Sequence, residues 1–464
     1  MPRAIPFFPR RSPAVCTVLL GLVSLAIGVG APSPVCAQAR LGGQTVSGSD
    51  TTAVTQRGEP LTRAERWRRK RRRKAQRSPS SQPGVGTRVR HFLAEIGGSV
   101  VPHRFILDVP QLEVAGVHPV LGGLEGNAGV TAGLLYEPPS LTGDQQFTSV
   151  EALGSLRGYY GLEALAGVEL DRYVTYGYGR FNHRPEEGFY GVGPDSRTSN
   201  ESVYRLDRGL FGALLGRSLG RRMLLGGHLS YQVNRFGRGQ GSLPQITEQF
   251  EGLPGVGASA DFLMFGTFFE FDSRDTPYDR AFGHRFAPTE DRLRSVSLEA
   301  TRGFYLAAEV THNVDTRKKA FDFTRFTLDV REFLPVDEEL MHGFVFRQFV
   351  SVTQSPDGQV PFYRLQSLGG ARSLRGYEGG RFHGRNVVLT NAEVRCQVWH
   401  WLDMALFADV GQVFEDIDTA QFDTPKAGYG LGFRIKKDGQ TLGRIDVARS
   451  EQGITTHLDL GSLF

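Results

Sequence analysis

The chain has 464 residues, of which 40% are hydrophobic and 22% are charged, and its formal net charge is +5. Beyond residue 40, no stretch contains about 18 consecutive apolar residues, which excludes a bundle of transmembrane helices. The 58 glycines and 32 phenylalanines together favour an all-β protein with many tight turns and an aromatic surface.

The first 39 residues have the pattern of a secretory signal peptide. Arginines precede an apolar run over residues 14–30, and an A-x-A cleavage pattern ends at Ala39. Cleavage there would leave Cys396 as the single cysteine, which excludes an intramolecular disulfide and offers no metal-ligand spacing. We therefore expect an exported protein without disulfides or a metal site.

Residues 40–90 form a polar leader that contains a strongly basic segment, residues 63–77. A capping box of Thr62 and Glu65 predicts that this segment begins a helix, and residues 78–86 read as a linker. The positive charge of this segment is densest at seven consecutive residues, Arg68, Arg69, Lys70, Arg71, Arg72, Arg73 and Lys74. Three interpretations remain open: a solvated run, a contact with an anionic membrane surface, or a plug inside a barrel.

The positive charge of the chain is confined to its N-terminal part. Residues 63–77 carry +9, residues 1–39 carry +3 and residues 40–62 are neutral, so −7 remains for residues 78–464. The main domain, predicted over residues 91–464, is therefore mildly acidic. Export and this charge distribution exclude nucleic acid as a partner.

From about residue 125 the sequence alternates between apolar and polar residues, as amphipathic strands do. Over residues 427–436, Tyr429 and Leu431 share one face, whereas glycines, Arg434 and Lys436 share the other. A period of two places the apolar set outward and the small or charged set inward. The runs of this kind are residues 126–137, 146–156, 158–170, 172–183, 202–218, 221–236, 258–273, 291–302, 303–313, 321–334, 339–353, 361–368, 386–400, 403–414, 426–437, 440–449 and 453–464. Because single-chain outer-membrane barrels have an even number of strands, we predict 16 strands from these 17 runs.

The end of the chain favours a membrane barrel over a soluble β-sandwich. Leu458, Leu460 and Phe464 lie on one face of a strand that ends in phenylalanine. Outer-membrane barrels typically end this way, because the assembly machinery reads that strand. Together with the signal peptide, this predicts a transmembrane antiparallel up-and-down β-barrel in the Gram-negative outer membrane.

A glycine-rich stretch, residues 367–385, contains one arginine for which a partner can be named. Strand phase places Glu393, Asp409 and Gly411 on the lumen side of the two strands that follow. A guanidinium group offers five donors that carboxylates accept in pairs, so a long loop folded into the barrel could deliver Arg375 to these acids. We predict this loop lock and expect Arg372 and Arg381 to remain solvated.

Four stretches resemble the bacterial surface-antigen superfamily of outer-membrane barrels, which includes insertases of the BamA and TamA type and translocators of the FhaC type. They are Leu374-Arg375-Gly376-Tyr377, the stretch from Phe407 to Gly411, residues 271–283 and the C-terminal strand. Residues 189–196 also resemble a stretch of surface-antigen barrels that lack periplasmic repeats. The resemblance implies a barrel with an inward-folded loop, held by Arg375, Gly376 and Tyr377.

The resemblance also implies a function in protein insertion or translocation through a weak seam between the first and last strands. Since the leader is shorter than a periplasmic POTRA module, we expect a member without POTRA domains, whose client is unknown. The alternative is a passive or plugged channel, or a structural surface antigen. We expect no enzymatic activity, no catalytic residue and no cofactor. The expected partners of the monomeric barrel are outer-membrane lipid, lipopolysaccharide, client proteins and the assembly machinery.

Overall fold

The computed structural model describes residues 100–101, 105–106, 116–122, 124, 128–138, 146–170, 172–220, 222–275, 300–337, 342–417, 425–437 and 440–460. The predicted signal peptide, the leader with its basic segment 63–77, and Phe464 lie outside these residues. In the described part of the chain, no helix is both long enough and apolar enough to cross a bilayer.

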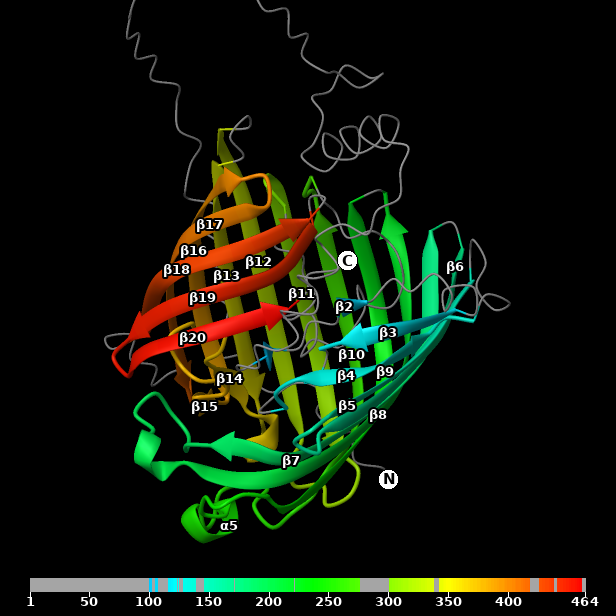
Figure 1. Ribbon diagram of the computed structural model, residues 1–464. Coiled ribbons are helices and arrows are strands. Elements are labelled where there is room, and N and C mark those ends of the chain that lie inside the picture. Colours follow the sequence, from blue (N-terminus) through cyan, green and yellow to red (C-terminus); the bar gives the residue numbers. More distant parts are fainter. Residues whose placement is uncertain are drawn as a thin grey trace, which may run out of the picture.

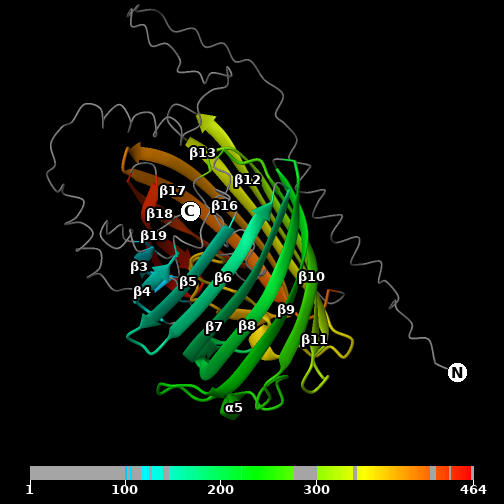
Figure 2. The same ribbon diagram turned by 90° about the vertical axis from the view of Figure 1, so that its right-hand side faces the viewer.

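Sixteen strands form one continuous antiparallel wall, in which each strand pairs with the next along the chain. This confirms the predicted all-β fold and strand number, and Figures 1 and 2 show the strands curving around a common interior. The strands are β3 (Val117–Leu121), β4 (Thr131–Tyr136), β5 (Gln146–Ser155), β6 (Tyr160–Leu170), β7 (Tyr173–Phe189), β8 (Ser202–Leu219), β9 (Met223–Arg238), β10 (Asp261–Asp272), β11 (Gly303–Asp315), β12 (Phe323–Asp337), β13 (His342–Gln354), β16 (Asn386–Trp399), β17 (Leu402–Phe414), β18 (Lys426–Lys437), β19 (Gln440–Ser450) and β20 (Gly453–Leu460).

The two faces of the wall differ in chemistry, as the alternation in the sequence requires. On β18, Tyr429 and Leu431 are exposed on the outside, whereas Arg434 and Lys436 are buried on the inside. Apolar side chains are stable in contact with the lipid outside the barrel. Charged side chains are costly to place in lipid and find oppositely charged partners in the lumen. The outer surface is thus apolar and the C-terminal half of the inner surface is charged.

The two ends of the barrel differ in the length of their connections. At one end, connections of two residues join β6 to β7, β16 to β17 and β18 to β19, while the connection from β10 to β11 at this end spans residues 273–302. Most connections at the other end are longer than two residues, and they include η1 (Thr198–Asn200), α5 (Ile246–Gln249), η2 (Phe362–Arg364), β14 (Gln366–Leu368) and β15 (Phe382–Gly384). Outer-membrane barrels carry short turns on the periplasmic side and long loops on the outside, so the end with α5 is the extracellular end.

The ends of β7 and β8, the connection that contains α5 and a segment of the long loop 355–385 pack together at the extracellular end. The cluster has Phe189, Tyr204, Leu206, Ile246, Phe362 and Tyr363 as its buried members. Phe362 makes edge contacts with Phe189 at 5.5 Å and with Tyr204 at 4.8 Å between ring centroids. We call this cluster the extracellular cap, and Figure 1 shows α5, β14 and β15 at this end of the barrel.

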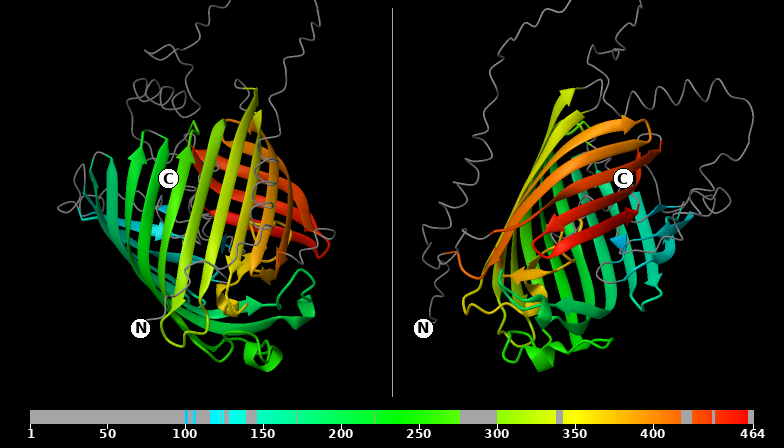
Figure 3. Two further views of the ribbon diagram at one scale, coloured as in Figure 1. Left: turned by 180° about the vertical axis from the view of Figure 1, so that it is seen from behind. Right: turned by 60° about the vertical axis from the view of Figure 1, so that its left-hand side comes forward.

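The seam between the first and last wall strands is built differently from the rest of the wall. Among the described strand pairs, β20 pairs with β19 and β1, and β3 pairs with β4 and β2, but β3 and β20 are not paired with each other. Instead, β1 (Val100–Val101) pairs in parallel with β20, and β2 (Phe105–Ile106) pairs antiparallel with β3. Figure 3 shows β16 to β20, in orange and red, as one side of the molecule.

Three of the predicted strand positions need comment. Residues 361–368 do not form a wall strand: they contain η2 and β14, and β14 pairs with β15 inside the long loop. Conversely, β3 is a wall strand that the prediction lacked. Of the run 291–302, residues 291–299 lie outside the described residues, and residues 300–302 precede β11.

Candidate functional site

The long loop folds back into the barrel because it carries an apolar face of its own. Leu374 is fully buried and Tyr377 is 1% exposed, and both belong to one cluster with Leu368 and Phe382 of the loop. The cluster is completed by lumen-facing residues of the wall, namely Phe349, Val387, Leu389 and Val413. Burial of this surface holds the loop against β13, β16 and β17 and positions the arginine between Leu374 and Tyr377.

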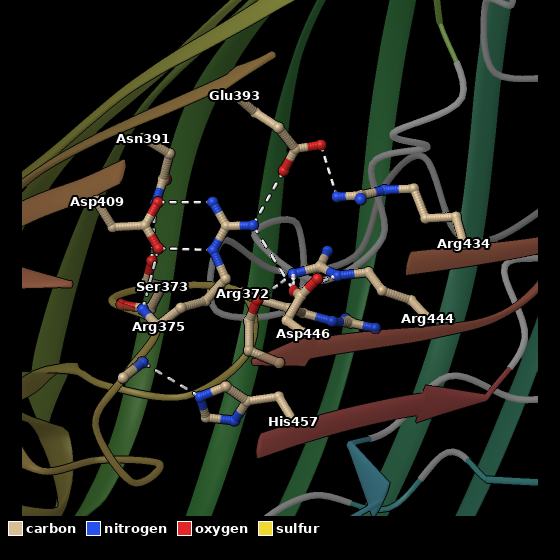
Figure 4. Close-up of polar contacts among 12 residues, drawn as sticks. Arg372, Ser373, Arg375, Asn391, Glu393, Asp409, Arg434, Arg444, Asp446 and His457 are labelled. Carbon is tan, nitrogen blue, oxygen red and sulfur yellow. Dashed lines mark hydrogen bonds and ion pairs between the residues drawn. The ribbon is translucent and has the colours of Figure 1, made fainter. Parts of the chain in front are cut away.

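Arg375 is buried in the lumen and binds both predicted carboxylates (Figure 4). Its Nε and Nη2 atoms donate to Asp409 Oδ2 and Oδ1 at 2.6 and 2.7 Å, and its Nη1 donates to Glu393 Oε2 at 2.9 Å. The backbone N–H of Arg375 also donates to Asp409 Oδ2, at 3.1 Å. The structure therefore brings Arg375, Glu393 and Asp409 together, with Asp409 fully buried.

Further charges surround this group. Arg434 Nη2 and Arg395 Nε both donate to Glu393 Oε1, at 2.6 and 2.5 Å. Asp446 lies 3.6 Å from Arg375 Nη1 and accepts a hydrogen bond from Arg444 Nε at 2.6 Å. Each buried charge thus has an opposite charge as neighbour, which a low-dielectric interior requires.

The electrostatic balance favours the charged form of Arg375. Burial alone would lower the pKa of its guanidinium group, but the charges of Asp409, Glu393 and Asp446 outweigh burial and raise that pKa above its ordinary value. The side chain is therefore a permanent cation, held by the loop against the lumen side of the wall.

Phe407, the first residue of the family-like stretch that ends at Gly411, is also part of the site. The guanidinium carbon of Arg375 lies 3.5 Å from the centre of the Phe407 ring. A cation over an aromatic face is attracted by the ring quadrupole, and the planar guanidinium stacks well there. Phe407 therefore fixes the plane of the side chain that Asp409 binds edge-on.

Gly376 connects the loop to the last two strands. Its carbonyl accepts hydrogen bonds from Ser450 Oγ at 2.7 Å and from Thr455 Oγ1 at 3.2 Å, and its N–H donates to His457 Nε2 at 3.4 Å. Its φ of +95° is a left-handed conformation that a side chain would strain. Tyr377 adds a hydrogen bond from its hydroxyl to the carbonyl of Ala427, at 3.2 Å.

Taken together, the motif from Leu374 to Tyr377 contacts every strand from β16 to β20. Glu393 lies on β16, Asp409 on β17, Ala427 on β18, Ser450 on β19 and His457 on β20. Gly411, also predicted for the site, lies on β17, where an added Cβ would come within 2.9 Å of Leu368 in β14. We call this set of contacts the loop anchor.

The structure corrects the expectation that Arg381 is solvated. Arg381 is 2% exposed, its Nη1 and Nη2 donate to Ser196 Oγ and O, and its Nε donates to Gln452. The partners come from a loop 185 residues earlier and from the turn between β19 and β20, which no local pattern could reveal. Arg372 is half-buried, and its carbonyl accepts a hydrogen bond from Arg347 at 2.8 Å.

A second buried arginine lies in the stretch 271–283 that resembled the family. Arg274 donates to Asp272 Oδ1 and Oδ2 at 2.9 and 2.7 Å and lies over the Tyr305 ring at 4.7 Å. Asp275 accepts the backbone N–H of Thr301 at 2.9 Å. These contacts join the ends of β10 and β11 at the periplasmic end.

Of the predicted C-terminal residues, Leu458 and Leu460 lie in β20. Leu458 pairs with Ile445 of β19 on one side and with Val100 of β1 on the other, and Leu460 pairs with Gly443. Phe464 and the basic residues 68–74 lie outside the described residues.

Residues 170–450 match the Omp85 superfamily domain. The structure is similar to that of BamA from Haemophilus ducreyi lacking POTRA domains 1-3, with a TM-score of 0.54, 11% sequence identity, and coverage of 86% of this chain and 81% of that chain. It also aligns with CdiB from Escherichia coli, with a TM-score of 0.49, 14% identity, and coverage of 74% of this chain and 62% of that chain. No curated protein sequence matches this chain.

A wall of 16 antiparallel strands with an apolar outside, a charged lumen and an inward-folded loop defines a β-barrel of the bacterial outer-membrane type. The family match covers more than half of the chain, including the loop anchor up to Ser450. The chain belongs to the Omp85 superfamily.

Proposed function

We propose that this chain assists the insertion or translocation of client proteins at the Gram-negative outer membrane. The observation that carries the proposal is the seam, where the two terminal wall strands are not paired with each other among the described strand pairs. An unpaired strand edge presents N–H and C=O groups to which another extended chain can add as a further strand.

The strands on the N-terminal side of the seam are short. β3 has five residues and β4 has six, whereas a transmembrane β-strand needs about 9–11 residues. Pro119 in the middle of β3 has no N–H, which weakens the pairing of that edge further. A short and poorly paired first strand is the feature that favours exchange of edge partners over a permanently closed wall.

Two short pieces of this chain occupy the edges in the absence of a client. Val100 pairs with Leu458 of β20, and Phe105 pairs with Leu121 of β3. Each of these two strands is only two residues long, so few hydrogen bonds are lost when it separates from the wall strand that it pairs with. We infer that a client strand takes the place of these pieces during its assembly.

The extracellular cap counts against the alternative of an open channel. Its aromatic side chains are buried against one another, and Phe362, fixed in the loop, is 1% exposed. Such packing places aromatic side chains over part of the outer end, which supports the seam over an open lumen as the working part of the barrel.

A reversible lock of the seam tests the proposal. In a Cys396→Ala background, one variant carries cysteines at positions 100 and 458 and at positions 105 and 121, which are paired residues. A matched control carries cysteines at positions 213 and 229, which are paired on the far wall. Outer-membrane proteomics of a deletion strain that expresses each variant measures client assembly.

We expect the deletion to reduce the abundance of some outer-membrane proteins. The seam-locked variant should restore them only under reducing conditions, whereas the control should restore them under both conditions. Full restoration by the oxidised, cross-linked seam variant would contradict a role of the seam, and an unchanged proteome in the deletion strain would contradict the function itself.

A further inference from the structure

One row of residues on the lumen side crosses the wall from the periplasmic end to the extracellular end. Each member is paired directly with the next across neighbouring wall strands from β10 to β19, and the members are Asp272, Tyr305, Arg331, Arg347, Asn391, Asp409, Gly428 and Ser450. Asp272 is the last residue of β10 and Ser450 is the last residue of β19, at opposite ends of the barrel. Because barrel strands are tilted, a row that follows the hydrogen bonds runs from one end to the other. We call this set the lumen row.

The long loop lies along the extracellular half of the lumen row. Arg347 Nη1 donates to the carbonyl of Arg372, and Asn391 Nδ2 donates to the carbonyl of Ser373, both at 2.8 Å (Figure 4). The row members on β17, β18 and β19 then contact residues 375–376. Successive members of the row thus meet the loop in chain order, so the path of the loop backbone follows the row.

The periplasmic half of the lumen row ends at Arg274, whose side chain is fully buried and bound to Asp272. The centre of the Tyr305 ring lies 4.7 Å from the guanidinium carbon of Arg274 and 5.8 Å from that of Arg331. A cation within about 6 Å of an aromatic ring centre is attracted by the ring. Tyr305 therefore connects the family-like stretch at the end of β10 to the arginines of the row.

The middle of the lumen row contains two arginines and one acid. Arg331 and Arg347 lie directly opposite each other, an arrangement in which like charges repel. Both bind Asp329: Arg331 Nη2 donates to Oδ2 at 2.7 Å, and Arg347 Nε donates to Oδ1 at 3.1 Å. One carboxylate balances only one of the two cations, so the Tyr305 ring and the Arg372 carbonyl add to their stabilisation. The position of each arginine therefore depends on its neighbours on both sides.

We propose that the lumen row couples Arg274 at the periplasmic end to the inward-folded state of the long loop, with Tyr305, Arg331, Asp329 and Arg347 as positioning residues. The contacts from Arg274 to the carbonyl of Arg372 are contiguous, and the loop is the element with two states, held or free. Since coupling between two sites is reciprocal, a contact that moves Arg274 changes how firmly the loop is held. The proposal rests on the loop lock and does not depend on client insertion.

The variant Arg274→Gln tests the coupling from the periplasmic end. It removes the cation beside Tyr305, and protease cleavage within residues 367–385 on intact cells should rise about threefold to tenfold. The matched control is Glu309→Gln, which breaks a buried ion pair with His228 on the inner face of β11 but lies outside the lumen row. Cleavage in the control should equal that of the unmodified chain.

Three further arms make the result decisive. Arg274→Lys, which keeps a cation beside Tyr305, should give a smaller rise and guards against misfolding of the glutamine variant. Tyr305→Leu should raise cleavage by itself and abolish the additional effect of Arg274→Gln, whereas Tyr305→Phe keeps the ring and should preserve that effect. In the opposite direction, Arg375→Ala should accelerate hydrogen exchange in residues 300–306, where the N–H of Thr301 is bound to Asp275.

Four results would overturn the coupling. They are unchanged loop cleavage in both Arg274 variants, an equal rise in Glu309→Gln, the full effect of Arg274→Gln in the Tyr305→Leu background, and unchanged hydrogen exchange of residues 300–306 in Arg375→Ala.

Discussion

Gly428 of β18 lies directly against the backbone carbonyl of Arg375, so close that a Cβ at position 428 would collide with that oxygen. The loop backbone at Arg375 thus packs directly against this inward-facing glycine, where a side chain would not fit. The side chain of Arg375 binds Asp409 on the neighbouring strand, while its backbone rests on Gly428.

Replacement of Gly428 by alanine should displace the loop. Since the collision involves backbone, the neighbour cannot yield by rotating a side chain, and we expect a loss of about 1–3 kcal/mol in stability. Thermal unfolding followed by heat-modifiable gel mobility measures this loss. Gly379→Ala is the matched control, because an added Cβ at this loop position meets no atom within 4 Å. Equal melting temperatures of the two variants would contradict the close packing of the loop against Gly428.

Loss of the charge at position 375 should free the loop. Arg375→Ala leaves Asp409 buried without its main partner, whereas Glu393 keeps Arg395 and Arg434; breaking the buried pair of Arg375 and Asp409 costs about 3–5 kcal/mol. Protease cleavage within residues 367–385, measured on intact cells or vesicles, should increase. Asp409→Ala should have the same effect, and Arg375→Lys should be intermediate since it loses the bidentate contact. Unchanged cleavage in both alanine variants would refute the loop lock.

Acid should loosen the extracellular cap through His383. Burial, together with the charge of Arg381, lowers the pKa of His383 from 6.5 to about 4, and its ring lies 4.9 Å from that of Phe189. The folded state holds this histidine neutral, so its contribution is complete above pH 6.5 and is lost as the pH falls towards 4. The loss should approach about 1–3 kcal/mol.

The pH effect can be measured as protease cleavage of the extracellular loops between pH 7 and the pKa of about 4. His383→Gln provides the control, because glutamine does not titrate and its cleavage should change less over this range. Parallel curves for the two proteins would exclude His383 as the cause.

Deletion of Phe464 should reduce the amount of folded barrel in the outer membrane. The residue belongs to the C-terminal signal that the assembly machinery is expected to read, so its loss should act on assembly more than on the finished fold. Abundance and heat-modifiable mobility in outer-membrane fractions measure the effect, with a substitution at exposed Glu451 as a control. Normal abundance without Phe464 would argue against this signal.

The strand pattern was largely predictable from the sequence, because lipid and lumen select opposite chemistry on alternate residues. Fifteen of the predicted runs correspond to wall strands. β3 escaped notice since it is only five residues long and contains Pro119. Residues 361–368 were wrongly predicted as a wall strand because they are rich in apolar side chains. These side chains pack into the extracellular cap and into the cluster around Leu374 instead of facing lipid.

The meeting of Arg375 with the two acids could be predicted from strand phase, whereas the other contacts of the loop anchor could not. Glu393 and Asp409 lie on adjacent strands and share the lumen side, so their meeting with Arg375 could be expected. The contacts of Gly376 with Ser450 and His457 depend on how the loop crosses distant strands. Such relationships depend on the three-dimensional path of the loop and have no local sequence pattern.

The loop anchor also has a consequence for the order in which the chain is assembled. Arg375, Gly376 and Tyr377 are buried in the barrel, and together they are hydrogen-bonded to five consecutive wall strands. A loop so enclosed cannot enter after the wall has closed around it. The final five strands must therefore form around the loop already in place, which makes the loop a template for the last third of its own barrel.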